Sequence, residues 1–217
     1  MSLGPPPNPN QTRVLLLRHA ETAAPDRFHG AESDVALGVR GFEQASEAAP
    51  RIVQTRPSAV YSSSMLRARQ TAEPIARACS LEVVAVAELH ERRMGSLSGM
   101  AMAEGWPAYI AAMTEWKAGN LEAAHEGGES FAQIRDRVVP AMDDLARRHR
   151  GETIVVVAHG VVIRVLLASW LDGGPGRFDR FGIDFVAVND LRFDGQAWRA
   201  FALNEVAVSA PESLSHG

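Results

Sequence analysis

The chain has 217 residues, enough for one domain that buries roughly 70% of the surface exposed by its unfolded chain. It carries 22 Lys+Arg and 26 Asp+Glu, a net charge of −4, which argues against a nucleic-acid-binding protein because such proteins present a strongly basic face. Cys79 is the only cysteine, so we expect neither a disulfide framework nor a thiolate metal site. No stretch approaches the roughly 20 apolar residues of a membrane-spanning helix. We therefore expect a cytoplasmic protein with no membrane partner.

The two ends of the chain differ in character from the rest. Residues 1–11 contain four prolines and no apolar targeting segment, and we expect them to form a disordered lead-in. Residues 12–208 show no internal repeat and no linker, which predicts a single domain. Residues 209–217 are expected to form a loose C-terminal tail.

Strands and helices alternate along the chain. Compact apolar or β-branched runs predict strands, and apolar residues spaced three or four apart predict helices. The predicted strands are residues 14–17, 58–62, 81–86 and 153–158, and the predicted helices are 38–55, 65–79, 107–118, 131–148 and 161–171. Residues 185–193 and 197–203 flank Asp194-Gly195, a dipeptide typical of a β-hairpin turn.

Several helix ends carry recognisable signals. Ser130 and Gln133 match a capping box at the start of the fourth helix. Pro107 stands where a proline at the first helical position would be expected. Ser63 or Ser64 could cap the second helix, and Pro74 is predicted to kink or split it. Alternation that ends in a hairpin predicts an α/β fold, a three-layer α/β/α sandwich with a mostly parallel central sheet.

Two predicted strands end in a histidine. One ends in Leu17-Arg18-His19 and the other in Ala158-His159-Gly160. Carboxyl ends of parallel strands meet at one edge of the sheet, where open α/β folds bind their ligands. Arg67 falls in the first turn of the helix that follows a neighbouring strand, and a helix N-terminus beside an arginine favours an anion. Two arginines and two histidines around one point predict a phosphate pocket, because guanidinium groups bind phosphate oxygens bidentately.

Other kinds of catalytic site lack their signatures. No pair of histidines has the spacing of a zinc motif and the carboxylates form no metal-binding loop pattern, so we expect neither a metal nor a cofactor. The Gly-x-Ser-x-Gly elbow of serine hydrolases is also missing.

These blocks resemble the histidine phosphatase superfamily, whose members have the phosphoglycerate-mutase-like fold. The matching blocks are Arg18-His19-Ala20-Glu21-Thr22, Asp34 to Ala45, Ser63 to Ala72, Leu89-His90-Glu91 with Gly95 to Gly99, Gly127-Gly128-Glu129-Ser130, and His159-Gly160. They occur in the family's order between about Arg13 and Asn204. One block alone is weak evidence, whereas six in sequence are strong evidence.

The resemblance implies a role for each matching residue. His19 would be the nucleophile that forms a phosphohistidine, Glu91 the general acid and base, and His159 the second catalytic histidine. The substrate would be bound by Arg18, Arg67, Thr22 and Gly160. The structural alternative for Glu91 is an ion pair with Arg92 or Arg93.

The sequence departs from the family pattern just after the first histidine. Ala20 replaces a glycine, a change that costs little if the local backbone suits an L-residue. The asparagine common in the family a few residues later is missing, and Arg27 or His29 could supply its phosphate contact instead.

Three functions fit this pattern. The first is a phosphatase of small phosphorylated metabolites. The second is a bisphosphoglycerate-dependent phosphoglycerate mutase, although the region between Gly99 and Gly127, where mutases carry a basic insertion, has only Lys117. The third is a non-catalytic phosphate-sensing module. The substrate itself stays open. The oligomeric state also stays open, with a homodimer as one possibility, because exposed aromatic residues such as Trp106 and Trp198 cannot be distinguished from buried ones in the sequence.

Overall fold

A six-stranded sheet forms the centre of the molecule. The computed structural model describes residues 4–171 and 174–206. The strands are β1 (Thr12–Arg18), β2 (Ala59–Ser63), β3 (Val83–Val86), β4 (Thr153–Ala158), β5 (Val188–Phe193) and β6 (Trp198–Glu205). Their order across the sheet is β3-β2-β4-β1-β5-β6. The first four are mutually parallel, whereas β5 runs antiparallel to β1 and β6 antiparallel to β5. The predicted mostly parallel sheet and C-terminal hairpin are confirmed.

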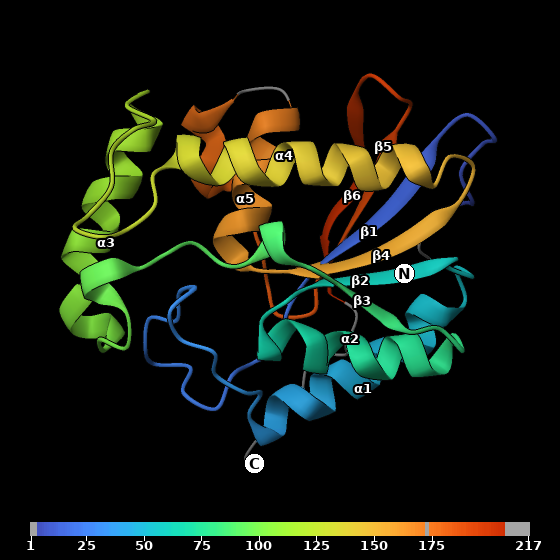
Figure 1. Ribbon diagram of the computed structural model, residues 1–217, viewed down its shortest axis with the longest axis horizontal. Coiled ribbons are helices and arrows are strands. Elements are labelled where there is room, and N and C mark those ends of the chain that lie inside the picture. The colour runs from blue at the N-terminus through green and yellow to red at the C-terminus, as the bar shows by residue number, and fades with distance from the viewer. Residues whose placement is uncertain (1–3, 172–173, 207–217) are drawn as a thin grey trace, which may run out of the picture.

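Helices cover both faces of the sheet (Figure 1). One face is covered by α1 (Val39–Val53) and α2 (Leu66–Ala78), and the other by α4 (Phe131–Arg148) and α5 (Gly160–Trp170). Side chains of a strand alternate between faces. In β1, Leu15 and Leu17 therefore pack with α1 and α2, while Val14 and Leu16 pack with α4 and α5. All four are fully buried, so β1 joins both halves of the core.

The helix α3 (Met102–Lys117) stands apart from the sheet at one end of the molecule (Figure 1). It begins five residues before Pro107, so the predicted start of this helix is wrong. Its first turn is fixed by tertiary contacts, because the Met102 N–H donates to the Asp26 carbonyl at 2.8 Å and Gly105 packs against the Phe28 ring. Such contacts are not visible in local sequence patterns.

Two other details of the helices differ from the predictions. Pro74 lies inside α2 without splitting it, and Met65 rather than a serine is the N-cap residue. The first turn of α2 is capped from outside, where the carboxylate of Asp34 accepts a hydrogen bond from the Leu66 N–H at 2.6 Å. By contrast, the capping box of Ser130 and Gln133 at the start of α4 is confirmed.

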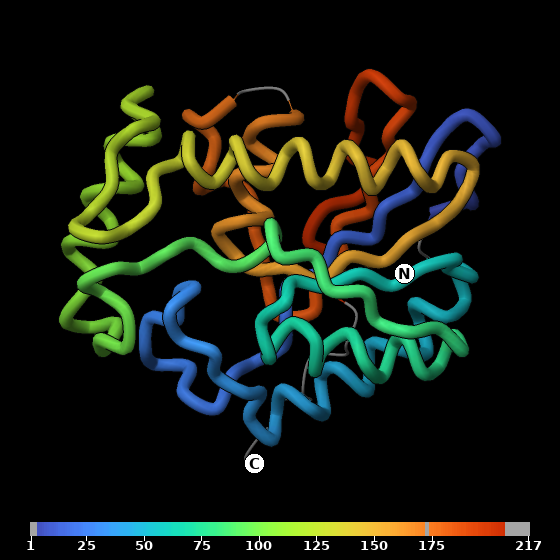
Figure 2. The backbone as a smooth tube through the Cα atoms, in the orientation of Figure 1, coloured from blue at the N-terminus to red at the C-terminus, as the bar shows by residue number. Residues whose placement is uncertain are grey.

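Two loops that are distant in sequence lie side by side beyond the sheet (Figure 2). The segment after β1 meets the segment after β3, where the Phe28 N–H donates to the Met100 carbonyl and the Gly99 N–H donates to the Phe28 carbonyl. Both segments start at carboxyl ends of parallel strands. They therefore wall off the edge of the sheet where the chemistry was predicted.

The ends and the surface of the chain complete the description. The carbonyl of Pro5 accepts a hydrogen bond from Arg192 at 2.8 Å, and residues 207–217, which include the expected loose tail, lie outside the described residues.

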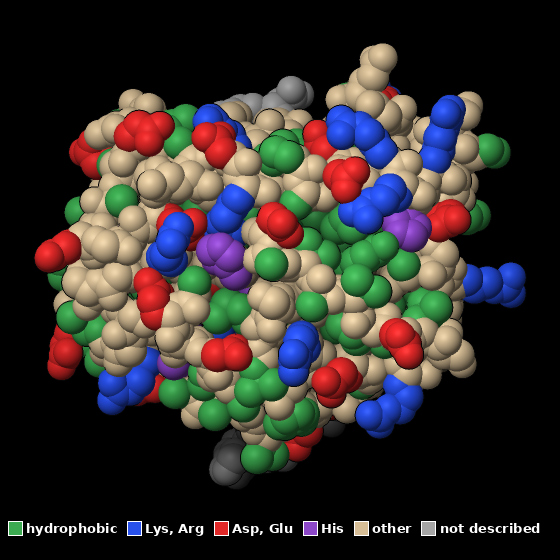
Figure 3. Space-filling model, viewed as in Figure 1, with side chains coloured by type: hydrophobic (Ala, Val, Ile, Leu, Met, Phe, Trp, Pro, Cys, Tyr) green, Lys and Arg blue, Asp and Glu red, His purple; other side chains and the backbone are tan. Residues whose placement is uncertain are grey.

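Trp198 is buried and stacks on Trp170, with the ring centroids 4.1 Å apart, whereas Trp106 is 47% exposed. Charges of both signs are mixed on the face in Figure 3. No helix within the described ranges is long and apolar enough to cross a membrane.

Candidate active site

A cavity of about 280 Å³ opens at the carboxyl edge of the parallel strands. Six of the predicted site residues line it: Arg18, His19, Thr22, Arg67, Glu91 and Gly160. The seventh, His159, lies behind this lining, with its ring centroid 5.2 Å from that of His19. The structure therefore brings all seven residues together, from β1, α2, the loop after β3, and the β4–α5 junction.

The orientation of His19 is fixed by its own neighbour. Its Nδ1 lies 2.7 Å from the carbonyl oxygen of Ala20. A carbonyl can only accept a hydrogen bond, so Nδ1 carries the proton and Nε2 of the neutral ring keeps its lone pair. The side chain is 6% exposed. A buried histidine with a free Nε2 lone pair has the form that a nucleophile requires.

The surroundings of His19 keep the ring neutral. Burial lowers the pKa of His19 well below its ordinary value, and the positive charges of Arg67 and Arg18 lower it further. The Ala20 carbonyl opposes this shift, but it is a smaller influence than these three. His19 therefore stays uncharged at neutral pH.

His159 is held by a serine. Its Nε2 lies 2.8 Å from the hydroxyl oxygen of Ser63, which also accepts a hydrogen bond from the Met65 N–H. The Ser63 hydroxyl can donate its proton to Nε2 while it accepts the Met65 N–H, and in this arrangement the proton of the His159 ring is on Nδ1. Burial, followed by the charge of Arg67, lowers the pKa of His159 well below its ordinary value. His159 is fully buried, and its Nδ1 has no hydrogen-bond partner within the described part of the chain.

The side chains of Arg18 and Arg67 are each anchored at one end by a backbone carbonyl. Nη1 of Arg18 donates to the Ile183 carbonyl at 2.8 Å, and Nη1 of Arg67 donates to the Ser33 carbonyl at 3.0 Å. The Nε atoms of both are buried and have no partner among the described residues. Burial lowers the pKa of each guanidinium from its very high ordinary value. Buried donors without partners are rare in folded proteins, so these atoms mark a binding site for an acceptor.

Gly160 and Phe185 both lie close to Arg18. A side chain at Gly160 would place its Cβ 3.5 Å from the Arg18 Nε. The Phe185 ring lies 4.0 Å from the Arg18 Cζ, which is a cation–π contact. This contact with Phe185 supports the guanidinium group of Arg18.

Glu91 projects into the cavity from the loop after β3. Its side chain is 8% exposed, and one carboxylate oxygen accepts the Arg92 N–H at 2.8 Å. The alternative of an ion pair is wrong, because Arg93 pairs with Glu129 and the Arg92 side chain donates to the Glu129 carbonyl. The carboxylate therefore remains available for proton transfer.

Motif residues that carry no chemistry hold the first loop. The Ala20 N–H donates to the Thr71 hydroxyl at 2.9 Å, and the Glu21 N–H donates to the Gln44 side chain at 3.0 Å. A Cβ at Gly41 would lie 2.0 Å from the Glu21 carbonyl oxygen, so only glycine fits there. Ala20 is not among the four described non-glycine residues with positive φ, so its backbone suits an L-residue.

The structure distinguishes Arg27 from His29, the two residues that could supply the phosphate contact of the missing asparagine. Both ring nitrogens of His29 are occupied, one by the Ser33 hydroxyl at 2.9 Å and the other by the Ala24 carbonyl at 2.7 Å. Arg27 lines the cavity and donates one hydrogen bond, from Nη1 to the Gly99 carbonyl at 2.7 Å. His29 is therefore a loop-stabilising residue, and Arg27 is the one with donors to spare.

The sequence did not identify several residues that the fold brings to the site. Ser63 is predicted as a possible helix cap and begins a matching block, but its contact with His159 is not predicted, while Phe185 and Arg164 belong to no motif. Ser63 holds His159, and Phe185 and Arg164 both line the cavity. A serine at the end of a parallel strand was the one signal that could have been used, because strand ends share an edge.

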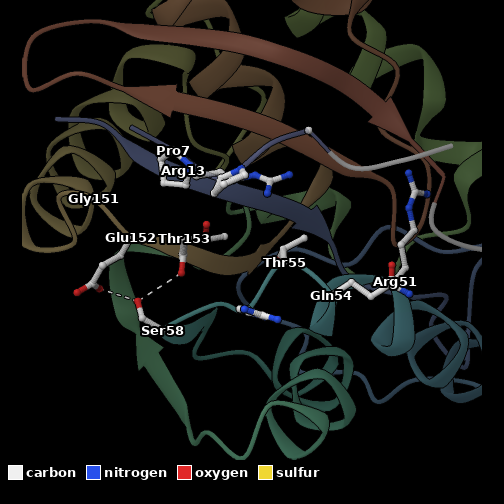
Figure 4. A pocket seen from close by; sticks show the side chains of 12 residues that line it. Pro7, Arg13, Arg51, Gln54, Thr55, Ser58, Gly151, Glu152 and Thr153 are labelled. Carbon is white, nitrogen blue, oxygen red and sulfur yellow. Dashed lines mark hydrogen bonds between the residues drawn. The ribbon is translucent and has the colours of Figure 1, made fainter. Parts of the chain in front are cut away.

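A larger cavity of about 610 Å³ lies at the opposite edge of the sheet, near the amino ends of β1 and β4 (Figure 4). Its Ser58 hydroxyl donates to Glu152 at 2.6 Å, and Arg13 forms a buried ion pair with Asp190 at 2.7 Å. Its described lining residues include no histidine and no cysteine. This cavity therefore offers no histidine on which a phosphohistidine could form.

Comparisons with known proteins agree with this geometry. The model of the histidine phosphatase superfamily (branch 1) matches residues 14–206. The chain is 37% identical over 197 residues to the metal-independent phosphoserine phosphatase of Arabidopsis thaliana, covering 86% of this chain and 81% of that protein. It is 34% identical over 191 residues to phosphoglycerate mutase-like protein 4 of Arabidopsis thaliana, covering 85% and 81%.

A solved structure is similar over nearly its whole length. The mycobacterial glucosyl-3-phosphoglycerate phosphatase in complex with VO3 aligns with a TM-score of 0.79 and 26% identity, covering 89% of this chain and 98% of that one. These similarities confirm the phosphoglycerate-mutase-like fold and the prediction of a phosphohydrolase. By the span of the family match, the chain belongs to the histidine phosphatase superfamily, branch 1.

Proposed function

We propose that this protein hydrolyses phosphate monoesters of small metabolites through a phosphohistidine formed on His19. One observation carries the proposal. A neutral histidine with a free Nε2 lone pair shares a site with three buried nitrogen donors that lack partners among the described residues. These donors are Nε of Arg18, Nε of Arg67 and Nδ1 of His159. Together they offer a nucleophile and a binding place for an oxyanion.

In the first step, Nε2 of His19 attacks the phosphorus atom in line with the ester oxygen. The new P–N bond forms as the P–O bond breaks, and Glu91 gives its proton to the departing oxygen. Negative charge on the transferring phosphoryl oxygens is balanced by Arg18 and Arg67. Nδ1 of His19 keeps its proton and its hydrogen bond to the Ala20 carbonyl throughout, which keeps the ring oriented.

In the second step, water replaces the substrate alcohol. Glu91 takes a proton from this water while its oxygen attacks phosphorus, and the P–N bond breaks to release inorganic phosphate and restore His19. Glu91 thus ends the cycle protonated, ready for the next ester. A carboxyl group that alternates in this way accelerates each step by about 10²–10⁴-fold.

The phosphoglycerate mutase alternative finds less support. A mutase must also bind a second phosphorylated group, and the only basic residue between Gly99 and Gly127 is Lys117. Its Nζ pairs with Asp179 at 2.5 Å and does not line the cavity. Water is therefore the favoured acceptor of the phosphoryl group.

The test is phosphate release from a panel of phosphorylated metabolites and one aryl phosphate, with His19→Ala as the blank. The panel contains O-phosphoserine because a similar protein is named for that substrate. We expect release with the unaltered protein and none with His19→Ala, together with a phosphoenzyme that only the unaltered protein forms. Normal hydrolysis by His19→Ala would rule out the proposed route.

The same panel tests the other two functions. Conversion of 3- to 2-phosphoglycerate on addition of bisphosphoglycerate, without phosphate release, would identify a mutase. Phosphate binding without turnover of the aryl phosphate would identify a non-catalytic sensing module. We further propose that this site binds a small phosphorylated molecule and that the protein binds neither nucleic acid nor membrane. Light scattering of the purified protein tests whether it forms a homodimer.

A further inference from the structure

The charges that line the active-site cavity exceed what a phosphate group needs. Four arginines line it, Arg18, Arg27, Arg67 and Arg164, against the single carboxylate of Glu91, which gives a net charge of +3. A phosphate monoester brings about −2 at neutral pH. Roughly one positive charge therefore remains without a counterion when the ester alone is bound, and an unpaired charge in a half-enclosed site is unfavourable.

Arg164 lies next to the phosphate clamp. It is placed four residues after Gly160 on α5, so the two share one face of the helix. Its Nε donates to the Phe181 carbonyl at 3.0 Å, while Nη1 of Arg18 donates to the Ile183 carbonyl two residues later. One short segment before β5 therefore holds both guanidinium groups at the cavity wall.

Arg164 has no carboxylate partner in the described part of the chain. Two other arginines that are buried or half-buried do have one: Arg13 pairs with Asp190 at 2.7 Å and Arg137 with Glu129 at 3.0 Å. No ion pair within 4.0 Å includes Arg164 among the described residues, although it is partly buried. Its positive charge also adds to burial in lowering the pKa of Arg18, which places it close to the clamp. Only the Nε of Arg164 is occupied, and both Nη groups remain as donors.

A wall of aromatic rings from α3 and the first loop also lines the cavity. Tyr109 stacks between Phe28 and Trp106, with ring centroids 5.2 Å and 5.5 Å apart. All three rings line the cavity. They offer an apolar surface for the carbon chain of a small substrate, and no further charge.

We propose that Arg164 binds a carboxylate that the substrate carries on the carbon chain next to its phosphate ester. The phosphate lies between Arg18 and Arg67, and the carboxylate lies on the Nη groups of Arg164. Arg164 is thus a specificity-determining residue, and the substrate class is the phosphorylated hydroxy acids and amino acids. This inference rests on the proposed phosphatase function.

The experiment compares substrates that differ only in the carboxylate. O-Phosphoserine is matched with O-phosphoethanolamine, and 3-phosphoglycerate with glycerol 1-phosphate. We expect the unaltered protein to have kcat/KM values about 10- to 100-fold higher for the carboxylate member of each pair, the effect of a hydrogen bond to a charged group. In Arg164→Met this preference should fall to within about threefold, because kcat/KM should fall further for the carboxylate member of each pair than for its partner or for the aryl phosphate.

Two further variants separate recognition from support of the loop. Arg164→Lys keeps the charge but loses the planar Nε–H donor to Phe181, so it should retain part of the preference. If Arg164 only supports the loop, Lys and Met should reduce activity on every substrate equally. Arg69→Met removes an exposed arginine outside the cavity lining and should leave the preference intact.

The outcomes distinguish the two proposals. An unaltered protein that hydrolyses the aryl phosphate but shows no preference within the matched pairs overturns the role of Arg164 and leaves the phosphatase function standing. A preference that survives in Arg164→Met overturns it as well. No phosphate release from any compound overturns the phosphatase function and this inference with it.

Discussion

The imidazole rings of His19 and His159 lie 5.2 Å apart and are tilted by 58°. Each ring is fixed by a different partner, the Ala20 carbonyl for His19 and the Ser63 hydroxyl for His159. Burial and Arg67 lower the pKa of both, and His19 contributes to the lowering for His159. The pair therefore exists as two neutral rings, and in the proposed route one attacks phosphorus while the other donates a hydrogen bond to a phosphoryl oxygen.

This pairing predicts how stability depends on pH. An unfolded histidine takes up a proton near pH 6.5, whereas His19 and His159 in the folded protein do so only at a much lower pH. Between these values the unfolded state binds more protons, so the free energy of unfolding falls as the pH falls below about 6.5. Each histidine contributes up to about 1.4 kcal/mol per pH unit. Urea unfolding between pH 7.5 and pH 5 measures this slope.

A variant assigns the slope to the site. His19→Gln should reduce the slope of the free energy of unfolding against pH by up to the contribution of one proton. His125, whose pKa is also lowered by burial and by Arg92, contributes part of the remaining slope. Equal slopes in His19→Gln and the unaltered protein would contradict the proposed neutral state of His19.

Removal of the proposed acid and base should depend on the leaving group. Glu91→Gln cannot give or take the proton, so turnover of alkyl phosphates should fall by about 10²–10⁴-fold. Phosphorylation of His19 by an aryl phosphate should be affected less, because its leaving group departs without protonation. It should appear as a burst of nitrophenol. Stopped-flow absorbance with p-nitrophenyl phosphate measures both phases.

Glu88→Gln is the matched control for this variant. Glu88 lies in the same loop and is exposed, and it contributes its backbone carbonyl, not its side chain, to the contact with Arg137. Its activity should equal that of the unaltered protein. A Glu91→Gln protein with the same rate as Glu88→Gln on every substrate would eliminate Glu91 as the acid and base.

Ser63→Ala should act mainly on His159, although it also removes the acceptor of the Met65 N–H at 3.3 Å. The change removes the donor to His159 Nε2 and leaves the ring free to take the other tautomer. One hydrogen bond of about 1 kcal/mol corresponds to roughly a five- to tenfold fall in kcat. The ring NMR signals of His159 should shift, while thermal unfolding changes only slightly. Unchanged kcat together with unchanged His159 signals would refute the positioning role of Ser63.

Treatment with a chelator should leave the activity unchanged, because each step of the proposed route uses only protein side chains. The residues that the structure describes also contain no group of three or more His, Cys, Asp or Glu that could hold a metal ion. Phosphate release is measured after dialysis against EDTA. Loss of activity that returns on addition of a divalent cation would contradict the metal-independent route.

The parts of the fold that local patterns encode could be read from the sequence. β4 is a run rich in β-branched residues and α4 carries its own capping box, and the predicted ends of both elements are confirmed. The start of α3 was not, since it depends on contacts with Asp26 and Phe28, which lie more than seventy residues earlier in the chain.

The site divides in the same way. Residues within recognisable motif blocks, such as His19 and Glu91, could be predicted. Arg164 could not, since an arginine on an apolar helix indicates nothing until the topology brings Phe181 and Arg18 beside it. The choice between Arg27 and His29 also required the hydrogen bonds of the folded loop.

The position of β1 in the sheet has a consequence for biosynthesis. β1 is made first, yet its two neighbours are β4 and β5, which begin at Thr153 and Val188. A nascent chain therefore carries the apolar strand around Leu16 without a pairing partner until Thr153–Ala158 has been synthesised. The carbonyl of Ile183 that orients Arg18 is made only slightly before β5. Long-range pairing of this kind slows folding, and a chain interrupted before β5 leaves an unpaired strand edge prone to aggregation rather than a weakened enzyme.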